Sequence, residues 1–381
     1  MSTRSVIFWV GLDVHKESIT AAVFRGREPE PLRVDRIPND PKRIRRYFER
    51  LQRDGQARAC YEASGAGYVL QRMLLEWGIP CELAAPSLIP RRAGEHRKTD
   101  RRDAIKIARD FRDDRLVLIH IPSEEEERVR DLVRCRETFQ GEILKSRHYI
   151  LKFLRRRGFI YREGTHWTTR HMNWIRQVLQ PGHLAEEDRI VLSEYLALLE
   201  YKLQRRDDLD RRIEALALTP RYKPVVDRIC CFRGFKTQAA MVIATELGDL
   251  RRFENPRQLM AYLGLVPSEH SSGDRRRLGA ITKAGNTRVR HVLVQAAWHY
   301  RKRPAVGPSL QRRQQDQDPA VIAHAWKCQH RLYKLFHRLA AKKPKQVAAT
   351  AVAREMVGFL WAVLRDVDPS ELQTPEVTHA A

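Results

Sequence analysis

Four acidic side chains in the first third of the sequence have the types and the spacing of a metal site. Asp13 ends an apolar run in the segment GLDVHK, and Glu62 follows the short apolar run 57–61. Asp100 and Asp103 are three residues apart in KTDRRDA, so on a helix they would share one face. A carboxylate at the end of an apolar strand is costly unless it meets a cation or a hydrogen-bond donor. Each acid alone has a plainer explanation as a surface or helix-start charge, so it is the set of four that favours a metal site.

The chemistry that fits such a set is displacement at phosphorus assisted by two metal ions. Clustered carboxylates repel one another unless cations separate them, and carboxylate oxygens are ligands that Mg²⁺ prefers. Two Mg²⁺ ions about 3.5–4 Å apart can serve the attacking and the leaving oxygen of a phosphodiester. We therefore predict two Mg²⁺ ions, with Mn²⁺ as an alternative, on a tetrad of metal ligands: Asp13, Glu62, Asp100 and Asp103.

A second candidate for chemistry is a serine pair in a basic segment of the last third of the chain. Ser271 and Ser272 precede Gly273, an order that favours a tight turn with an exposed hydroxyl. A serine hydroxyl is a weak nucleophile without activation, and no local His–Asp pair supplies a base, although His270 is adjacent. The cations around the pair would suit a scissile phosphate: Arg275, Arg276, Arg277, Lys283, Arg288 and Arg290. The alternative is a basic loop whose serines only contact phosphate.

Charge and hydropathy indicate the class of partner. The 71 Lys and Arg against 47 Asp and Glu give a net charge of +24, which favours a polyanion such as nucleic acid. The apolar run 6–10 is far too short for a signal peptide, and no later run approaches the ~20 apolar residues of a membrane span. The six cysteines lack disulfide-like spacing. We expect a cytoplasmic protein with no membrane partner.

The elements that must position the acids follow from periodicity. The first 120 residues alternate strand and helix signals, as in an α/β domain. The predicted strands cover 6–14, 19–24, 32–37, 57–61, 81–85 and 116–121, and the predicted helices 41–52, 66–77 and 99–111. Three strands followed by helix, strand, helix, strand and helix is the order of an RNase H-like domain.

The rest of the chain is predicted to be mainly helical. Long charged helices over 123–157 and 189–218, the first with a capping box at Ser123, indicate a helical hairpin or coiled-coil arm. The arm is either a dimerisation element or a solvated helical spacer. Two helices around the turn at 233–235 resemble a helix-hairpin-helix, 301–319 is expected to be a loop, and 320–364 is helical with a break at 342–345. The predicted domains are 1–122, 123–219 and 220–368, with a disordered tail at 369–381.

Four segments together resemble one known family. GLDVHK, YEASG, KTDRRDA and the block GLVPSEHSSG…GAITKAGN are similar to the DEDD transposases of bacterial insertion sequences, namely the insertion-sequence one-hundred-ten family of bridge-RNA-guided recombinases. The resemblance implies a RuvC-like N-terminal domain, a coiled-coil arm and a C-terminal transposase domain. The family's acidic tetrad falls on Asp13, Glu62, Asp100 and Asp103, and its catalytic serine on Ser272, with Ser271 as the alternative.

The resemblance also implies partners. They are Mg²⁺, double-stranded donor and target DNA, and a noncoding guide RNA that pairs with both. Homodimers are expected to assemble into a tetramer in which the carboxylates of one subunit meet the serine of another. The resulting hypothesis is a DNA recombinase of the bacterial cytoplasm, acting at the nucleoid, in which Ser272 attacks a phosphodiester. The alternatives are a RuvC-type nuclease that uses water, and a non-catalytic nucleic-acid-binding protein.

Overall fold

The computed structural model of the chain describes residues 6–63, 65–90, 99–269 and 277–367. The chain divides into two compact units, Met1–Pro122 and Ser123–Ala381, and each unit is considered by itself. The predicted tail at 369–381 lies outside the described residues.

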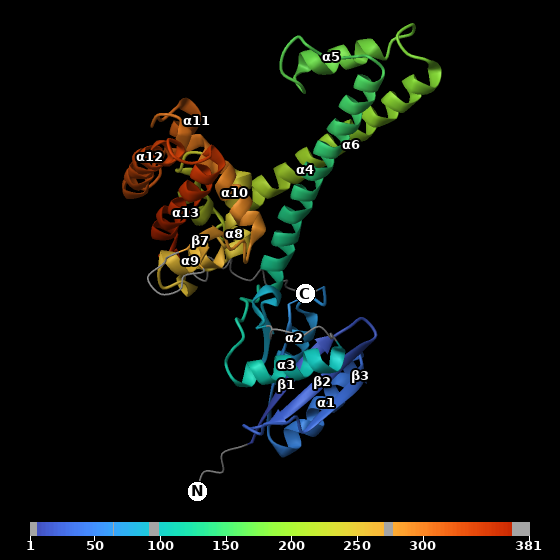
Figure 1. The fold of residues 1–381 in the computed structure, drawn as a ribbon, viewed down its shortest axis with the longest axis vertical. Helices are drawn as coiled ribbons and strands as arrows, with labels where there is room; N and C mark the ends of the chain where they lie inside the picture. Colours follow the sequence, from blue (N-terminus) through green and yellow to red (C-terminus); the bar gives the residue numbers. More distant parts are fainter. Residues whose placement is uncertain (1–5, 64, 91–98, 270–276, 368–381) are drawn as a thin grey trace, which may run out of the picture. The chain divides into compact units, whose positions relative to one another are not determined.

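A five-stranded mixed sheet forms the centre of the first unit (Figure 1). Its strands are β1 (Ile7–Val14), β2 (Ser18–Arg25), β3 (Arg33–Pro38), β4 (Gln56–Glu62) and β5 (Cys81–Ala84), in the order β3-β2-β1-β4-β5. β1, β2 and β3 form an antiparallel meander, whereas β4 lies parallel to β1 and β5 parallel to β4. The predicted order of strands and helices is observed as far as residue 112, which gives the mixed α/β region expected of this part of the chain.

Helices cover both faces of this sheet. α1 (Pro41–Asp54) and α2 (Val69–Glu76) pack on one face, where their apolar side chains share a buried cluster with the even-numbered residues of β1. α3 (Asp100–Arg112) packs on the other face, where Ala104 and Ala108 meet Ala22 and Phe24 of β2. Side chains alternate between the two faces of a strand, so the odd-numbered residues of β1 point toward α3.

The predicted strand at 116–121 does not form. This run makes one isolated antiparallel bridge, between Leu118 and Ala84, with hydrogen bonds from Ala85 N to Val117 O and from Ile119 N to Leu83 O. Its apolar residues predicted a strand, but Val117 and Leu118 are 51% and 41% exposed, so this run does not bury an apolar face as a strand of the sheet would.

Two long helices form the arm predicted for the second unit. α4 (Glu124–Arg156) has the predicted capping box, in which Ser123 and Glu126 exchange side-chain and backbone hydrogen bonds. It packs along α6 (Glu186–Ala217), and the shorter helix α5 (Thr169–Val178) closes the far end (Figure 1). Buried residues from all three helices, among them Ile150, Ile175 and Leu196, form a separate apolar cluster there.

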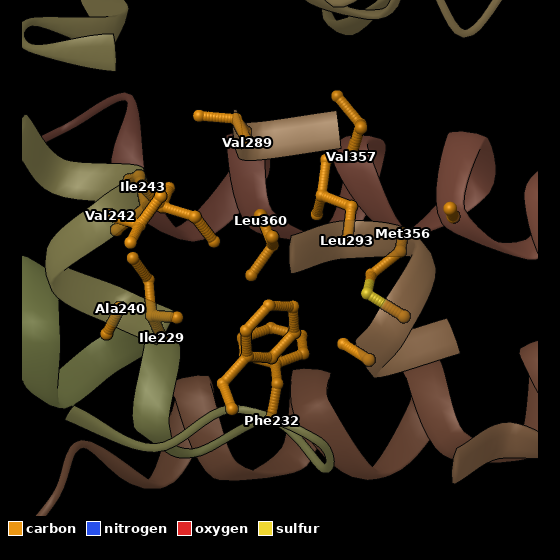
Figure 2. Packing of buried hydrophobic residues seen from close by; sticks show 14 of the residues in the cluster. Ile229, Phe232, Ala240, Val242, Ile243, Val289, Leu293, Met356, Val357 and Leu360 are labelled. Atoms are coloured by element: carbon orange, nitrogen blue, oxygen red, sulfur yellow. The ribbon is translucent and has the colours of Figure 1, made fainter. Parts of the chain in front are cut away.

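The remaining helices surround a larger core that includes the base of the arm. They are α7 (Lys223–Cys230), α8 (Thr237–Leu247), α9 (Pro256–Tyr262), α10 (Thr287–Ala297), α11 (Pro308–Gln314), α12 (Pro319–Ala340) and α13 (Lys345–Leu364), with 3-10 turns at Pro86–Leu88 in the first unit and at Leu250–Arg252 and Trp298–Arg301 in the second. Figure 2 shows Ile229, Phe232, Leu293, Met356 and Leu360 among the buried side chains of this core. The break predicted at 342–345 is observed between α12 and α13.

Two features of the second unit differ from expectation. The predicted loop at 301–319 contains the short helix α11, whose Leu310 is buried. α13 is long and apolar enough, by length and composition, to cross a membrane, but half of that stretch is buried. Its buried residues, such as Val352 and Met356, belong to the core, which explains the apolar composition.

Candidate metal centre

Two of the predicted acids end neighbouring parallel strands. Leu12 of β1 lies in register with Tyr61 of β4, and Asp13 and Glu62 are the next residues of the two strands. Leu12 and Tyr61 are buried with α1 and α2, so by alternation their neighbours Asp13 and Glu62 lie on the face that α3 covers. The register of the sheet therefore puts both acids at one edge and on one face.

Close packing of α3 on β1 requires a glycine in the strand. A Cβ atom at Gly11 would lie 2.3 Å from the carbonyl oxygen of Ala104 and 2.3 Å from the backbone nitrogen of Ala108. The helix begins just before this contact, where the Thr99 hydroxyl accepts a hydrogen bond from Arg102 N–H as an N-cap. Asp100 and Asp103 consequently occupy the first turn of a helix that lies directly on the strand of Asp13.

His15 links the strand acid to the helix acid. Its Nε2 atom lies 3.2 Å from Asp13 Oδ2 and 3.5 Å from Asp100 Oδ1. Ligand atoms of Asp13, His15 and Asp100 all lie within 4.8 Å of one another, a grouping that suits a shared cation. His15 was not among the predicted site residues. The signal for it was its place two residues after Asp13 in GLDVHK.

The electrostatics of Asp13 fit a site for a cation. Burial raises the pKa of its carboxyl group, the charges of Asp100 and Asp103 raise it further, and His15 opposes the rise. A bound divalent cation would offset this repulsion, and carboxylate oxygens are ligands of Mg²⁺, while imidazole also suits Mn²⁺. The donor set therefore fits a divalent metal ion.

The other two predicted ligands stand outside this tight group. Among the described residues, the grouping contains Asp13, His15 and Asp100 but neither Glu62 nor Asp103. Register places Glu62 beside Asp13, and the spacing of three places Asp103 on the face of α3 that carries Asp100. Metal binding by all four acids remains a prediction.

The predicted nucleophile falls outside the described residues. Ser271, Ser272, Arg275 and Arg276 lie between β6 (Pro267–Glu269) and β7 (Leu278–Ile281), which pair as an antiparallel hairpin. Only the two ends of the basic segment are described.

A buried acid anchors the chain that follows the hairpin. Glu246 in α8 accepts hydrogen bonds from Arg134 at 2.7 and 2.9 Å and from Asn286 Nδ2 at 2.7 Å. Asn286 in turn caps α10, accepting hydrogen bonds from the backbone N–H groups of Arg288 and Val289. Burial favours a raised pKa for Glu246, but these hydrogen bonds outweigh it and hold the pKa below its ordinary value.

Arginines predicted to bind nucleic acid also hold this region. Arg290 donates to the carbonyl oxygens of Leu263, Ala284 and Lys283, at 2.7, 2.8 and 3.0 Å. Arg288 pairs with Glu137 of α4. Lys283 has a positive φ of 56°, a strained conformation for a residue with a side chain. Contacts of Arg277, Lys283, Arg288 and Arg290 with nucleic acid remain predictions.

Two helices flank the turn at which a helix-hairpin-helix is predicted. α7 and α8 flank a turn in which Gly234 has a φ of 95°. A Cβ atom at Gly234 would lie 3.0 Å from the carbonyl oxygen of Ala296 in α10, so the glycine also permits tight packing. Binding of phosphate at this turn remains a prediction.

Comparisons with known proteins match both halves of the chain. Residues 10–157, which include the four acids, match a family model labelled as the DEDD type of IS110 and described as Transposase. Residues 226–309, which include Ser272 and the basic segment, match the model described as Transposase IS116/IS110/IS902 family.

Relatives cover most of the chain. The protein y4qE of Sinorhizobium fredii, named as a transposase, is 37% identical over 94% of this chain and 88% of its own length. The transposase for insertion sequence element IS1533 of Leptospira borgpetersenii is 30% identical over 88% of this chain and 98% of its own.

Proposed function

Because this chain belongs to the IS116/IS110/IS902 family of transposases, we propose that it cleaves and exchanges DNA strands with a metal-assisted serine nucleophile. The observation that carries the proposal is the meeting of Asp13 and Asp100 around His15 at the end of β1. Two carboxylates brought together in this way, one at a strand end and one at a helix start, are suitable ligands for a divalent cation.

The four acids have the role of metal ligands in this proposal. Asp13 and Asp100 would hold one cation, and Glu62 and Asp103 would complete a site for two. Mg²⁺ bound there would supply Lewis acidity toward the phosphodiester oxygens. His15, within hydrogen-bond distance of Asp13, would orient that carboxylate.

Ser272 has the role of nucleophile. Its Oγ forms a bond to phosphorus, the bond from phosphorus to the 3′ oxygen breaks, and the hydroxyl proton of the serine leaves to solvent or to the departing oxygen. The resulting phosphoserine link keeps the free energy of the phosphodiester, so a 3′-hydroxyl of another strand can attack it and restore the serine. Ser271 is the alternative nucleophile.

The cations of the basic segment would hold the scissile phosphate. Arg275, Arg276, Arg277 and Lys283 would contact its oxygens and stabilise the charge that develops in the transition state. Target choice would be delegated to a noncoding RNA that pairs with donor and target DNA, because base pairing can carry sequence specificity that the protein does not read. Dimers that assemble into a tetramer would join the acids of one subunit to the serine of another.

The test is an assay for a covalent protein–DNA adduct. Purified chain, Mg²⁺, RNA transcribed from the flank of the gene, and DNA labelled on each strand are incubated, and denatured products are separated. We expect an adduct with wild type and with Ser271→Ala, and none with Ser272→Ala or Asp13→Asn. Glu49→Gln, which removes one exposed carboxylate of α1, is the matched control and should leave the adduct unchanged.

The alternatives give different results in the same assay. Cleavage without an adduct, unaffected by Ser272→Ala, would identify a nuclease that uses water. Binding without cleavage, unaffected by Asp13→Asn, would identify a non-catalytic protein. An adduct lost in Ser271→Ala but kept in Ser272→Ala would move the nucleophile by one residue.

A further inference from the structure

Two tyrosines and three cations line a hollow on the arm, and none of them is among the residues of the proposed chemistry. Tyr149, Lys152, Arg155 and Arg156 of α4 and Tyr195 of α6 surround a volume of about 550 Å³. We call these five residues the arm patch. Lys152, Arg155 and Arg156 are spaced three and four residues apart, so they share one face of α4.

The aromatic pair in the arm patch is pre-arranged and accessible. The rings of Tyr149 and Tyr195 lie 6.0 Å apart at 32°. The buried ring of Phe153 contacts Tyr195 edge-on at 6.1 Å and so fixes its orientation. Tyr149 is 51% exposed. An exposed ring held beside a second ring offers a stacking surface, and because the fold already restricts the ring, little side-chain entropy is lost when a ligand binds.

The cations in the arm patch differ from most other cations of the arm. Most other arginines and lysines of these helices pair with acids, as Arg136 does with Asp210 at 2.7 Å and Lys202 with Glu142 at 3.3 Å. Within the part of the chain that the structure describes, Lys152 and Arg155 form no ion pair. Their charges are therefore available to an external anion.

Arg156 has one acid near it. The pKa of Asp188 is lowered, first by its hydrogen bonds from Arg157 and also by the charge of Arg156. Arg157, not Arg156, holds that carboxylate, at 2.5 and 2.6 Å. The arm patch thus keeps an excess of positive charge.

We propose that the arm patch binds an unpaired stretch of nucleic acid, with bases stacked on Tyr149 and Tyr195 and phosphates on Lys152, Arg155 and Arg156. Tyrosine rings can stack only on unpaired bases, because the base faces of a duplex already stack on one another. Cations alone would bind the phosphates of any strand, single or double. Contact with the same surface of a second copy is disfavoured, since a symmetric interface would bring these like charges together. The proposal rests on the proposed function only in that the chain acts on nucleic acid.

Binding is measured by fluorescence anisotropy on the full chain with labelled homopolymers of uridine and of thymidine, in EDTA so that no cleavage occurs. Stacking of one base on an aromatic ring contributes about 1–3 kcal/mol, so Tyr149→Leu should raise the Kd about tenfold. Tyr149→Phe keeps the ring and should bind as wild type. Lys152→Gln with Arg155→Gln should make the negative slope of log K against log salt shallower by about 1.4.

Matched controls come from the same arm. Tyr201→Leu removes an exposed tyrosine of α6 outside the arm patch, and Arg205→Gln removes an arginine that is paired with Asp208. Both should leave binding unchanged. A photoreactive uridine analogue should crosslink to Tyr149 or Tyr195 in wild type. Tighter binding of one homopolymer would identify RNA or DNA as the ligand.

Three outcomes would overturn the proposal. They are unchanged binding by Tyr149→Leu, an equal loss with Tyr201→Leu, or a change only in oligomeric state by light scattering, which would make the arm patch a protein interface. Asp13→Asn should bind the homopolymers normally. Failure of the cleavage assay would therefore leave this result intact, and failure here would leave the cleavage assay intact.

Discussion

Helix α3 can lie directly on strand β1 because residue 11 is a glycine and has no side chain. Gly11→Ala would force a Cβ atom into backbone atoms of Ala104 and Ala108, at 2.3 Å from each. Backbone cannot yield as a flexible side chain does, so the helix must move and carry Asp100 and Asp103 with it. We expect a loss of about 1–3 kcal/mol in the free energy of unfolding and about a hundredfold loss of metal-dependent cleavage.

Chemical denaturation and the cleavage assay measure the two effects. The matched control is Gly141→Ala, because a Cβ atom there meets no heavy atom within 4 Å in an exposed turn of α4. That substitution should stabilise the chain by about 0.5–1 kcal/mol. Full cleavage by Gly11→Ala would show that the acids do not depend on this contact.

Glu246 is the second residue whose removal should reach beyond its own position. Glu246→Gln removes the negative charge and replaces one acceptor oxygen by an NH2 donor, so at least one hydrogen bond from Arg134 is lost and those that stay, including any from Asn286, which caps α10, are weakened. Glu246 is buried, whereas the side chain of Arg134 is 40% exposed. Water can therefore replace some of the hydrogen bonds that Arg134 loses, which reduces the cost of the substitution. We expect a loss of about 2–3 kcal/mol in the free energy of unfolding, against less than about 1 kcal/mol for Glu355→Gln in an exposed pair.

The sign of the pH dependence follows from the lowered pKa of Glu246. A carboxyl whose pKa is lower in the folded state stabilises the fold above its unfolded value, 4.5, and loses that contribution as pH falls. Wild type should therefore lose stability below about pH 4.5 more steeply than Glu246→Gln, as measured by denaturation at each pH. Parallel curves would refute the role of this carboxylate.

At the scale of elements, the closed end of the arm depends on a neutral histidine. His171 is buried, accepts a hydrogen bond at Nδ1 from Trp167 N–H at 3.0 Å, and stacks on Trp174. Burial, with a smaller contribution from His166, lowers its pKa from 6.5 to about 4. Protonation would place a hydrogen on Nδ1 and remove the acceptor that Trp167 uses.

The prediction for this end of the arm is unfolding in acid. A histidine with a lowered folded pKa stabilises the fold above pH 6.5, and the contribution falls as pH drops from 6.5 toward 4. One pKa unit corresponds to about 1.4 kcal/mol, so full protonation costs on the order of 3 kcal/mol. The protection of α5 amides, measured as hydrogen exchange relative to the intrinsic rate at each pH, should fall over this range in wild type but not in His171→Gln. His183→Gln, at an exposed histidine, should behave as wild type.

Elements with local signals could be predicted from the sequence, and elements made by distant contacts could not. The capping box of Ser123 and Glu126 and the N-cap Thr99 fix helix starts within a few residues, so α4 and α3 were predicted closely. α5 was not predicted because its buried face includes His171, a polar residue that breaks the apolar periodicity of the sequence. Only the packing of α5 against α4 and α6 buries this face.

The candidate site divides in the same way. The places of Asp13 and Glu62 at strand ends could be predicted because strand ends are visible in hydrophobic patterning, and the places of Asp100 and Asp103 in a first helical turn because Thr99 marks a helix start; their role as metal ligands stays a prediction. His15 could not be predicted as a partner of Asp100, since the two are far apart in sequence and are joined only when α3 lies on β1. The structural role of Glu246 could not be predicted for the same reason, because its partners Arg134 and Asn286 are distant in sequence.

At the scale of the whole molecule, the chain contains two units with separate cores. Separate cores can unfold separately, so we expect two transitions in calorimetry. Gly11→Ala should lower the midpoint of one transition only, and Glu246→Gln the midpoint of the other. Equal shifts of both transitions by either variant would show that the units unfold as one.

The length of the arm has a consequence for insertions and deletions. α4 has 33 residues and α6 has 32, so at about 1.5 Å per residue each helix is a rod of about 50 Å. Each added residue turns the far end by about 100°. Two residues added to both helices would swing Tyr149 to roughly the opposite side of the rod, whereas seven would lengthen the rod and nearly restore its phase. The length of the arm therefore fixes the direction in which its far end points, and natural length variants should differ by numbers of residues close to whole turns, such as about seven, eleven or eighteen.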